Sequence, residues 1–282
     1  MKRSISNFAL CFLLTTFSCD KTRSADATSS FDTVPVVTKL NPLIGETSGI
    51  ADSKKNKGFL WVHEDSGNPP DIKLVSHNGT VEKSIRLKGA INRDWEDMAL
   101  AGTDLYVADI GDNNKVFADY TMYYFPEPLA SVDTVKEYTS IKFKYPDGSH
   151  DAEAFLVDAE TKNIYIITKS DNPAKIFKIS HPYTGLNTAT EVGSLKYGSV
   201  VSAALSTNGR EIIVKTYGSL NHYVVAAGET IEAALQKKST PLPYILEPQG
   251  EAVTFAADNS GYFTLSEKGF SSIVNLYFYK RK

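Results

Sequence analysis

The sequence predicts an all-β protein, a five-bladed β-propeller, from three observations. A short pattern recurs five times: a small residue or Glu, a few apolar residues, a turn, and a second apolar strand. The repeats begin at residues 48, 96, 153, 203 and 251, so their intervals are 48, 57, 50 and 48 residues, as expected for one four-stranded blade each. The two ends of the chain also supply complementary parts of one blade. The repeat openings are Ser48-Gly49-Ile50, Glu96-Asp97-Met98, Glu153-Ala154-Phe155, Ala203-Ala204-Leu205 and Glu251-Ala252-Val253.

The first three repeats each supply four expected strands. Asn78-Gly79 separates the last two strands of blade one, and this pair is a strong signal for a two-residue hairpin. Trp61 and Trp95 are expected to pack between blades. The expected strands are 48–51, 58–62, 72–76 and 81–87 in blade one; 96–100, 104–110, 121–125 and 138–145 in blade two; and 153–157, 164–168, 174–179 and 191–195 in blade three.

The last two repeats are less regular. Blade four has expected strands at 201–206, 211–216 and 222–226, followed by a short helix at 229–237 with acidic residues in its first turn and lysines in its last. Blade five has three strands, at 251–255, 262–265 and 273–279. The apolar segment 35–40 would provide the fourth and close the ring, which removes an exposed sheet edge. The alternative of six blades needs a further blade within 117–145 or 226–248.

The first 33 residues are expected to lie outside the propeller. Lys2-Arg3, an apolar run over 8–17 and then Ser18-Cys19 resemble a bacterial lipoprotein signal (1–19) that ends at a lipidated Cys19. Ordinary secretion is the alternative. Residues 20–33 are rich in Ser, Thr, Ala and Asp and predict a flexible tether, which leaves 34–282 as a single propeller domain.

The cysteine count and the net charge limit the kinds of site and partner to be expected. Cys11 lies in the signal, so the exported chain keeps only Cys19 and offers no disulfide, zinc site or cysteine nucleophile. A net charge of −3 with scattered Lys and Arg argues against nucleic acid. We expect a monomer that binds an unknown small molecule or protein and meets a membrane only through its lipid, at the outer membrane or cell surface.

Aligning the repeats places three carboxylates around the central channel. Glu96, Glu153 and Glu251 share one position on the first strand, where the other blades have Ser48 and Ala203. Because side chains alternate along a strand, the residues two positions earlier face the same way. Crowded carboxylates raise one another's pKa or bind a cation, and oxygen ligands suit Ca²⁺ or Mg²⁺. These earlier residues are Glu46, Asp94 and Asp151.

The ends of the second strands carry different chemistry. Lys169 and Lys215 could neutralise the channel glutamates, which would make the ring purely structural. A cation site is one alternative, and a site in which the lysines and His63 hold an anionic ligand is another. The alignment groups His63, Asp109, Thr168, Lys215 and Ser266 at one position, and Glu64, Ile110, Lys169, Thr216 and Glu267 at the next.

Two loops after second strands are rich in carboxylates, Gly and Asn. The first, 63–68, contains His63, Glu64 and Asp65; the second, 109–114, contains Asp109 and Asp112. Such loops can wrap a cation or present polar groups to a ligand, although the same residues also make good turns. Neither has the spacing of an EF-hand loop. Motifs of serine hydrolases, zincins and phosphate-binding loops are absent from the sequence.

Several segments resemble exported bacterial propellers related to the SdiA-regulated and phytase-like groups. The resemblance runs from about residue 46 to 267, and it implies the fold first of all. Phytase-like propellers bind calcium and hydrolyse phosphomonoesters, so the resemblance also implies such an activity, but the calcium ligands cannot be matched one by one and blade four departs at Ala203. The segments are Ser48-Gly49-Ile50, His63-Glu64-Asp65-Ser66-Gly67, Asp94-Trp95-Glu96-Asp97-Met98-Ala99, Ala108-Asp109-Ile110-Gly111-Asp112-Asn113, Phe125-Pro126-Glu127-Pro128, Asp151-Ala152-Glu153-Ala154 and Glu247-Pro248-Gln249-Gly250-Glu251-Ala252.

Two functions follow as hypotheses. The first is a surface- or periplasm-exposed lipoprotein that binds a ligand or partner at an acidic rim, with Ca²⁺ as the expected cation. The second is a metal-dependent hydrolase of phosphomonoesters, in which Glu96, Glu153 and Glu251 serve as metal ligands or general base and Lys169 or Lys215 holds the phosphate. A purely structural role is the third possibility.

Overall fold

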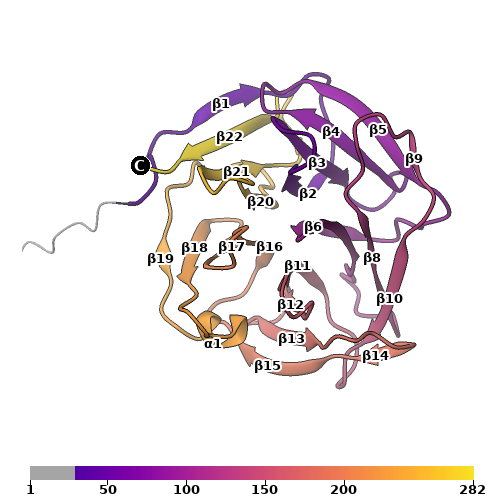
Figure 1. The fold of residues 1–282 in the computed structure, drawn as a ribbon. Coiled ribbons are helices and arrows are strands. Elements are labelled where there is room, and N and C mark those ends of the chain that lie inside the picture. Colours follow the sequence, from indigo (N-terminus) through magenta and orange to yellow (C-terminus); the bar gives the residue numbers. More distant parts are fainter. Residues whose placement is uncertain (1–28) are drawn as a thin grey trace, which may run out of the picture.

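Five sheets stand in a ring around a central axis, so the five-bladed propeller is confirmed (Figure 1). The structure is a computed structural model and describes residues 29–282. The expected signal at 1–19, its Cys19 and the first part of the tether lie outside the described residues. Among the described residues, no helix has the length and apolar character needed to cross a membrane.

The first three blades contain the strands that the repeats predict, with the innermost strand first. Blade one also receives a short strand from the connection within blade two, and blade two receives one from blade three; both pair in parallel with the outermost strand of the earlier blade. The strands of blade one are β2 (Thr47–Asp52), β3 (Phe59–Glu64), β4 (Asp71–Ser76) and β5 (Val81–Leu87), with β9 (Thr134–Val135) at the edge. Blade two has β6 (Trp95–Ala101), β7 (Asp104–Asp109), β8 (Tyr120–Pro126) and β10 (Thr139–Lys144), with β14 (Leu186–Thr188) at the edge; blade three has β11 (Ala152–Val157), β12 (Ile164–Thr168), β13 (Lys175–Ile179) and β15 (Thr190–Ser194).

Blade four contains the expected helix in a shorter form. The helix α1 (Ile231–Leu235) begins after the cap Thr230, whose side chain accepts a hydrogen bond from the Ala233 amide. No basic residue lies in its last turn; Lys237 follows the helix and pairs with Glu229 at 2.6 Å. The strands of blade four are β16 (Val200–Leu205), β17 (Glu211–Thr216), β18 (Ser219–Val224) and β19 (Thr240–Pro241).

The N-terminal strand closes the ring in blade five. The strand β1 (Val36–Lys39) pairs antiparallel with β22 (Asn275–Lys280), and β21 (Gly261–Leu265) and β20 (Ala252–Phe255) complete the sheet. The packed domain starts earlier than the predicted boundary at residue 34. Phe31 is fully buried and forms an isolated β-bridge with Arg281. Its aromatic ring fills the seam between blades four and five. The prediction of a flexible tether is therefore wrong for residues 31–33.

The core is divided into five apolar clusters, and each lies between two neighbouring blades. Trp61 and Trp95 are both fully buried in the cluster between blades one and two, which confirms their expected packing role. Burying a large apolar side chain contributes roughly 1.5–3 kcal/mol, so these seams hold the ring rigid. A rigid ring fixes the loops at its two rims. We call the rim that carries Asp65, Asp94 and Glu96 the acidic rim.

Candidate functional site

A β-bulge in the first strand of four blades orients the channel residues. In each case the register with the second strand shifts by one residue, so one side chain is left out of the ladder and turns toward the axis. The bulge corrects one alignment: blade four has Val201 at this position, and Ala203 lies two residues further along. Blade five has no bulge between β20 and β21, and Glu251 stands just before β20. The bulged residues are Ser48, Glu96, Glu153 and Val201.

The second-strand alignment also needs correction. Asp109 pairs with Trp95 and so precedes the bulge, whereas His63 pairs with Gly49, beyond it. His63 is therefore equivalent to Ala108 and not to Asp109. Lys215 pairs with Ser202, which also lies beyond the bulge, so Lys215 is likewise not equivalent to Asp109.

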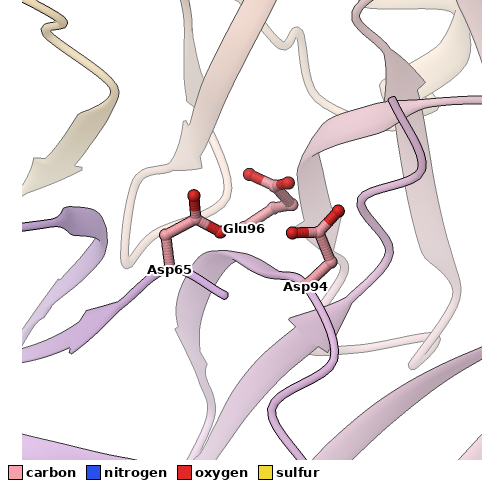
Figure 2. A group of neighbouring side chains, drawn as sticks. All are labelled: Asp65, Asp94 and Glu96. Atoms are coloured by element: carbon pink, nitrogen blue, oxygen red, sulfur yellow. The ribbon is translucent and has the colours of Figure 1, made fainter. Parts of the chain in front are cut away.

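Three carboxylates from two blades meet at the acidic rim. Asp65 follows β3 of blade one, Asp94 precedes β6 of blade two, and Glu96 is the bulged residue of β6. One carboxylate oxygen from each lies within 4.8 Å of the others, and the three groups face a common space (Figure 2). The sequence predicted Asp94 and Glu96 as metal ligands and Asp65 as a rim residue, and the fold brings them together.

Gly111 makes room for this group. A Cβ atom at Gly111 would collide with the Oε1 atom of Glu96 and the Oδ2 atom of Asp94. The backbone of the loop after β7 therefore passes directly against both carboxylates, and only glycine allows this approach. Its amide donates to the Asp94 carbonyl at 3.2 Å, which fixes the loop in that place.

Without a bound cation, burial and mutual repulsion disfavour the charged forms of the three carboxylates. Burial, followed by the charge of Asp65, raises the pKa of Asp94 to about 6. Burial raises the pKa of Glu96 well above its ordinary value, and Asp65 and Asp94 raise it further. Burial also raises the pKa of Asp65. Each carboxylate has lost water and faces like charge, so a bound cation would stabilise all three.

Two further carboxylates extend the acidic group toward blade five. Glu251 accepts a hydrogen bond from the Tyr217 hydroxyl at 2.6 Å, and its charge raises the pKa of Glu96. Burial, followed by the charge of Glu251, raises the pKa of Glu267 to about 8. Glu96 and Glu251 therefore lie close enough for their charges to interact.

Glu153 has a different environment. Its Oε1 atom forms an ion pair with Lys169, while its Oε2 atom is buried without a hydrogen-bond partner among residues 29–282. The Lys169 charge also lowers the pKa of Asp65 and Glu96. A self-neutralised pair, one of the alternatives for the whole ring, thus exists in blade three.

Lys215 does not neutralise the channel glutamates directly. It is fully buried, pairs with Glu247 at 3.1 Å, and lies 3.8 Å from the centre of the Tyr244 ring. Its ion pair connects blade four to the segment before blade five. The predicted role of Lys215 as a rim residue is wrong, because its register places it inside the blade.

His63 and Glu64 are likewise occupied in packing. His63 is fully buried beside the Trp95 ring, and burial lowers its pKa to about 4, so the imidazole is neutral. Glu64 pairs with Lys73 at 3.0 Å and accepts the Gly45 amide at 3.2 Å. His63 therefore does not lie on the rim as predicted.

Three predicted aspartates hold the rim loops in place. Asp109 accepts the Asp94 amide at 2.7 Å, and so orients one of the three clustered carboxylates. Asp151 accepts the Asp112 amide at 3.1 Å and the Ser170 hydroxyl.

Asp112 in turn accepts the amides of Val116 and Phe117, each at 2.9 Å, and the Tyr120 hydroxyl at 2.8 Å. These bonds use the carboxylate oxygens that a metal would need. Asp112 and Asp151 are therefore loop-forming residues in this structure.

Asp97 is the central residue that sequence reasoning missed. It is fully buried on β6, and its carboxylate accepts the Ser202 hydroxyl at 3.2 Å and the Ala203 amide at 3.1 Å, both from blade four. This contact crosses the axis between blades that are not neighbours. The available signal was a second acid, beside Glu96, in a strand whose other residues are apolar.

The comparisons with known proteins support the fold. No protein-family model and no curated protein match the sequence. Among solved structures, β-propeller-like proteins are similar. A luciferin-regenerating enzyme has a TM-score of 0.52 at 9% identity, covering 87% of this chain and 95% of its own. An auxiliary nutrient binding protein from Bacteroides thetaiotaomicron has a TM-score of 0.50 at 6% identity, covering 89% and 73%. At such identity the likeness concerns the fold alone.

Proposed function

We propose that this protein is a binding propeller whose acidic rim holds a divalent cation, with Ca²⁺ as the first candidate, and that a ligand or partner binds there. The observation that carries the proposal is the convergence of Asp65, Asp94 and Glu96 on one space within 4.8 Å. Oxygen-only ligands from separate loops suit Ca²⁺. A bound cation with open coordination positions can then receive an oxygen of the ligand.

Calcium titration followed by thermal unfolding tests this proposal. A ligand that binds only the folded state at 100 times its Kd stabilises it by about 2.7 kcal/mol. We expect a calcium-dependent rise in Tm for the wild type, and none for Glu96→Gln or Asp94→Asn. Asp119→Asn, an exposed acid in the loop after β7, is the matched control and should keep the rise. No rise in the wild type at millimolar calcium would overturn the cation site.

A metal-dependent phosphomonoesterase is the second candidate. It is favoured by Lys169, whose ammonium lies close enough to Asp65 and Glu96 to lower their pKa. A cation beside a lysine can hold a phosphate ester and neutralise the leaving oxygen. Hydrolysis of p-nitrophenyl phosphate that needs calcium and is lost in Glu96→Gln would support it. Hydrolysis that survives this change would contradict it.

The relationship to SdiA-regulated and phytase-like propellers is part of the same proposal. It is supported by two of the segments that resemble those groups: 94–99 supplies Asp94 and Glu96, and 63–67 supplies Asp65. The acidic group therefore lies within the resembling segments.

We further propose that the protein is exported and anchored by a lipid at Cys19, at the outer membrane or cell surface. The apolar run that ends at Ser18-Cys19 supports this placement. Labelling with a radioactive fatty acid in a bacterial host should mark the wild type and not Cys19→Ala. Equal labelling of both would contradict the anchor, and an unlabelled, secreted wild type would favour the alternative of plain secretion.

A further inference from the structure

A cavity lies at the rim opposite the acidic rim, where the ring closes between blades one and five. It has a volume of about 620 Å³, within the ~300–1,000 Å³ range of small-molecule sites. The turns β2–β3 and β20–β21 form its polar side, and β1 and β22, which lie side by side in Figure 1, form its apolar side. It shares no lining residue with the three clustered carboxylates. We call this cavity the closure pocket; it includes Thr38, Lys54, Lys57, His77, Phe263 and Phe278.

Three rings form one wall of the closure pocket. The His77 and Phe263 ring centres are 4.7 Å apart at an interplanar angle of 43°. Phe263 and Phe278 follow at 4.6 Å and 33°. Together with Val36 and Leu276, these rings line the cavity, so the wall suits a planar apolar body.

Both carboxylates of the closure pocket accept hydrogen bonds from the protein. Asp52 contacts His77 Nε2 at 2.7 Å with one oxygen and accepts the Ala257 amide at 2.7 Å with the other. Asp258 accepts the Ser260 amide at 2.9 Å.

The two lysines of the pocket are not neutralised in this way. Lys54 donates to the Gly102 carbonyl at 3.0 Å and has no carboxylate partner among residues 29–282. Across the same residues, Lys57 forms no side-chain hydrogen bond or ion pair. The formal charges of the lining balance, with two lysines against two aspartates, but the ammonium groups of Lys54 and Lys57 are the charged groups that neither a carboxylate nor a histidine of the described residues contacts on this side of the cavity.

From this arrangement we propose that the closure pocket binds a small planar aromatic anion, with the ring against Phe263 and Phe278 and the acidic group toward Lys54 and Lys57. The apolar wall supplies most of the buried area, and the ammonium groups select the charge. This site is independent of the cation at the acidic rim.

Binding of 1-naphthoate, measured by titration calorimetry on the full domain, tests the proposal. We expect saturable binding of one equivalent, and at least tenfold weaker binding of 1-naphthylmethylammonium, which has the same rings and the opposite charge. Binding should weaken at least tenfold in Lys54→Met/Lys57→Met. The same removal of charge at Lys238, which does not line the pocket, should leave it unchanged.

Filling the closure pocket gives a second, independent readout. Thr38→Trp or Val36→Trp should abolish binding, because both side chains face the cavity from the edge strand β1. Val37→Trp is the matched control, since the neighbouring side chain points to the other face of the strand. Asp94→Asn should also retain binding, which separates this site from the acidic rim.

The proposal would be overturned by no saturable binding of 1-naphthoate, by equal binding of the cationic analogue, or by unchanged binding in both filled variants with normal thermal unfolding. Loss of binding in Asp94→Asn alone would move the ligand to the acidic rim and would equally overturn it.

Discussion

Glu96 and Glu153 are the bulged residues of neighbouring blades, yet their environments are opposite. Glu96 faces the like charges of Asp65 and Asp94, whereas Glu153 is paired with Lys169. The difference arises one residue beyond the second strand. There blade three carries Lys169, which reaches its own blade's glutamate, while blade one carries Asp65, which reaches the glutamate of blade two. The same position after the second strand therefore contributes to a structural ion pair in one case and to a crowded group of carboxylates in the other.

The largest expected effect is loss of the ion pair in blade three. Lys169→Met leaves the buried Glu153 unpaired and should lower the free energy of unfolding by about 2–4 kcal/mol, as for other buried charges that lose a partner. Urea unfolding measures this change. The double variant Lys169→Met/Glu153→Gln should recover most of the loss, and an equally unstable double variant would contradict the pairing.

Gly111→Ala should affect the group of carboxylates that contains Glu96 and leave the Glu153–Lys169 pair unchanged. The added Cβ would press against Glu96 and Asp94, so we expect a cost of roughly 1–3 kcal/mol and loss of the calcium-induced rise in Tm. Gly218→Ala, in the turn between β17 and β18 with open space around it and no positive φ, provides a comparison for the backbone effect of a lost glycine. A Gly111→Ala protein that retains the full calcium response would contradict the proposed site.

Replacing Glu96 or Glu153 with neutral Gln should change the free energy of unfolding in opposite directions in calcium-free buffer. Glu96→Gln removes a like charge from a crowded group and should raise the free energy of unfolding by about 1 kcal/mol. Glu153→Gln removes the partner of Lys169 and should lower it by about 1 kcal/mol. Urea unfolding with a chelator present compares the two. The same sign for both variants would show that the blades do not differ as described.

The contribution of Glu211 to the pH dependence of stability tests a well-paired carboxylate, and its expected effect is smaller. Its pKa is lowered to about 2 by His222 first and then by Arg281, which it contacts at 3.0 and 2.6 Å. Because the folded pKa is below the unfolded value of about 4.5, the stabilisation is present above pH 4.5 and is lost as the pH falls toward 2. The pair is partly exposed, so we expect about 1 kcal/mol after screening.

The control for that pH dependence is Glu211→Gln. Its free energy of unfolding should fall less steeply than that of the wild type between pH 4.5 and 2. Parallel curves would contradict the assigned stabilisation.

The chain itself determined the blade count, the strand positions and the closure by its two ends. These features follow from local patterns, namely alternating strands, turn residues such as Asn78-Gly79 and a period near 50 residues. The sequence also indicated that carboxylates gather at one rim, because residues at equivalent repeat positions share a side of the ring.

Only the tertiary structure decided which charges meet. The bulges shift the register by one residue, which buries His63 and Lys215 and turns Glu96 and Glu153 toward the axis. Contacts across blades then join Asp65 to Glu96 and carry Asp97 to blade four. Such contacts depend on three-dimensional approach between segments far apart in the chain, and no local pattern encodes a shift of one residue.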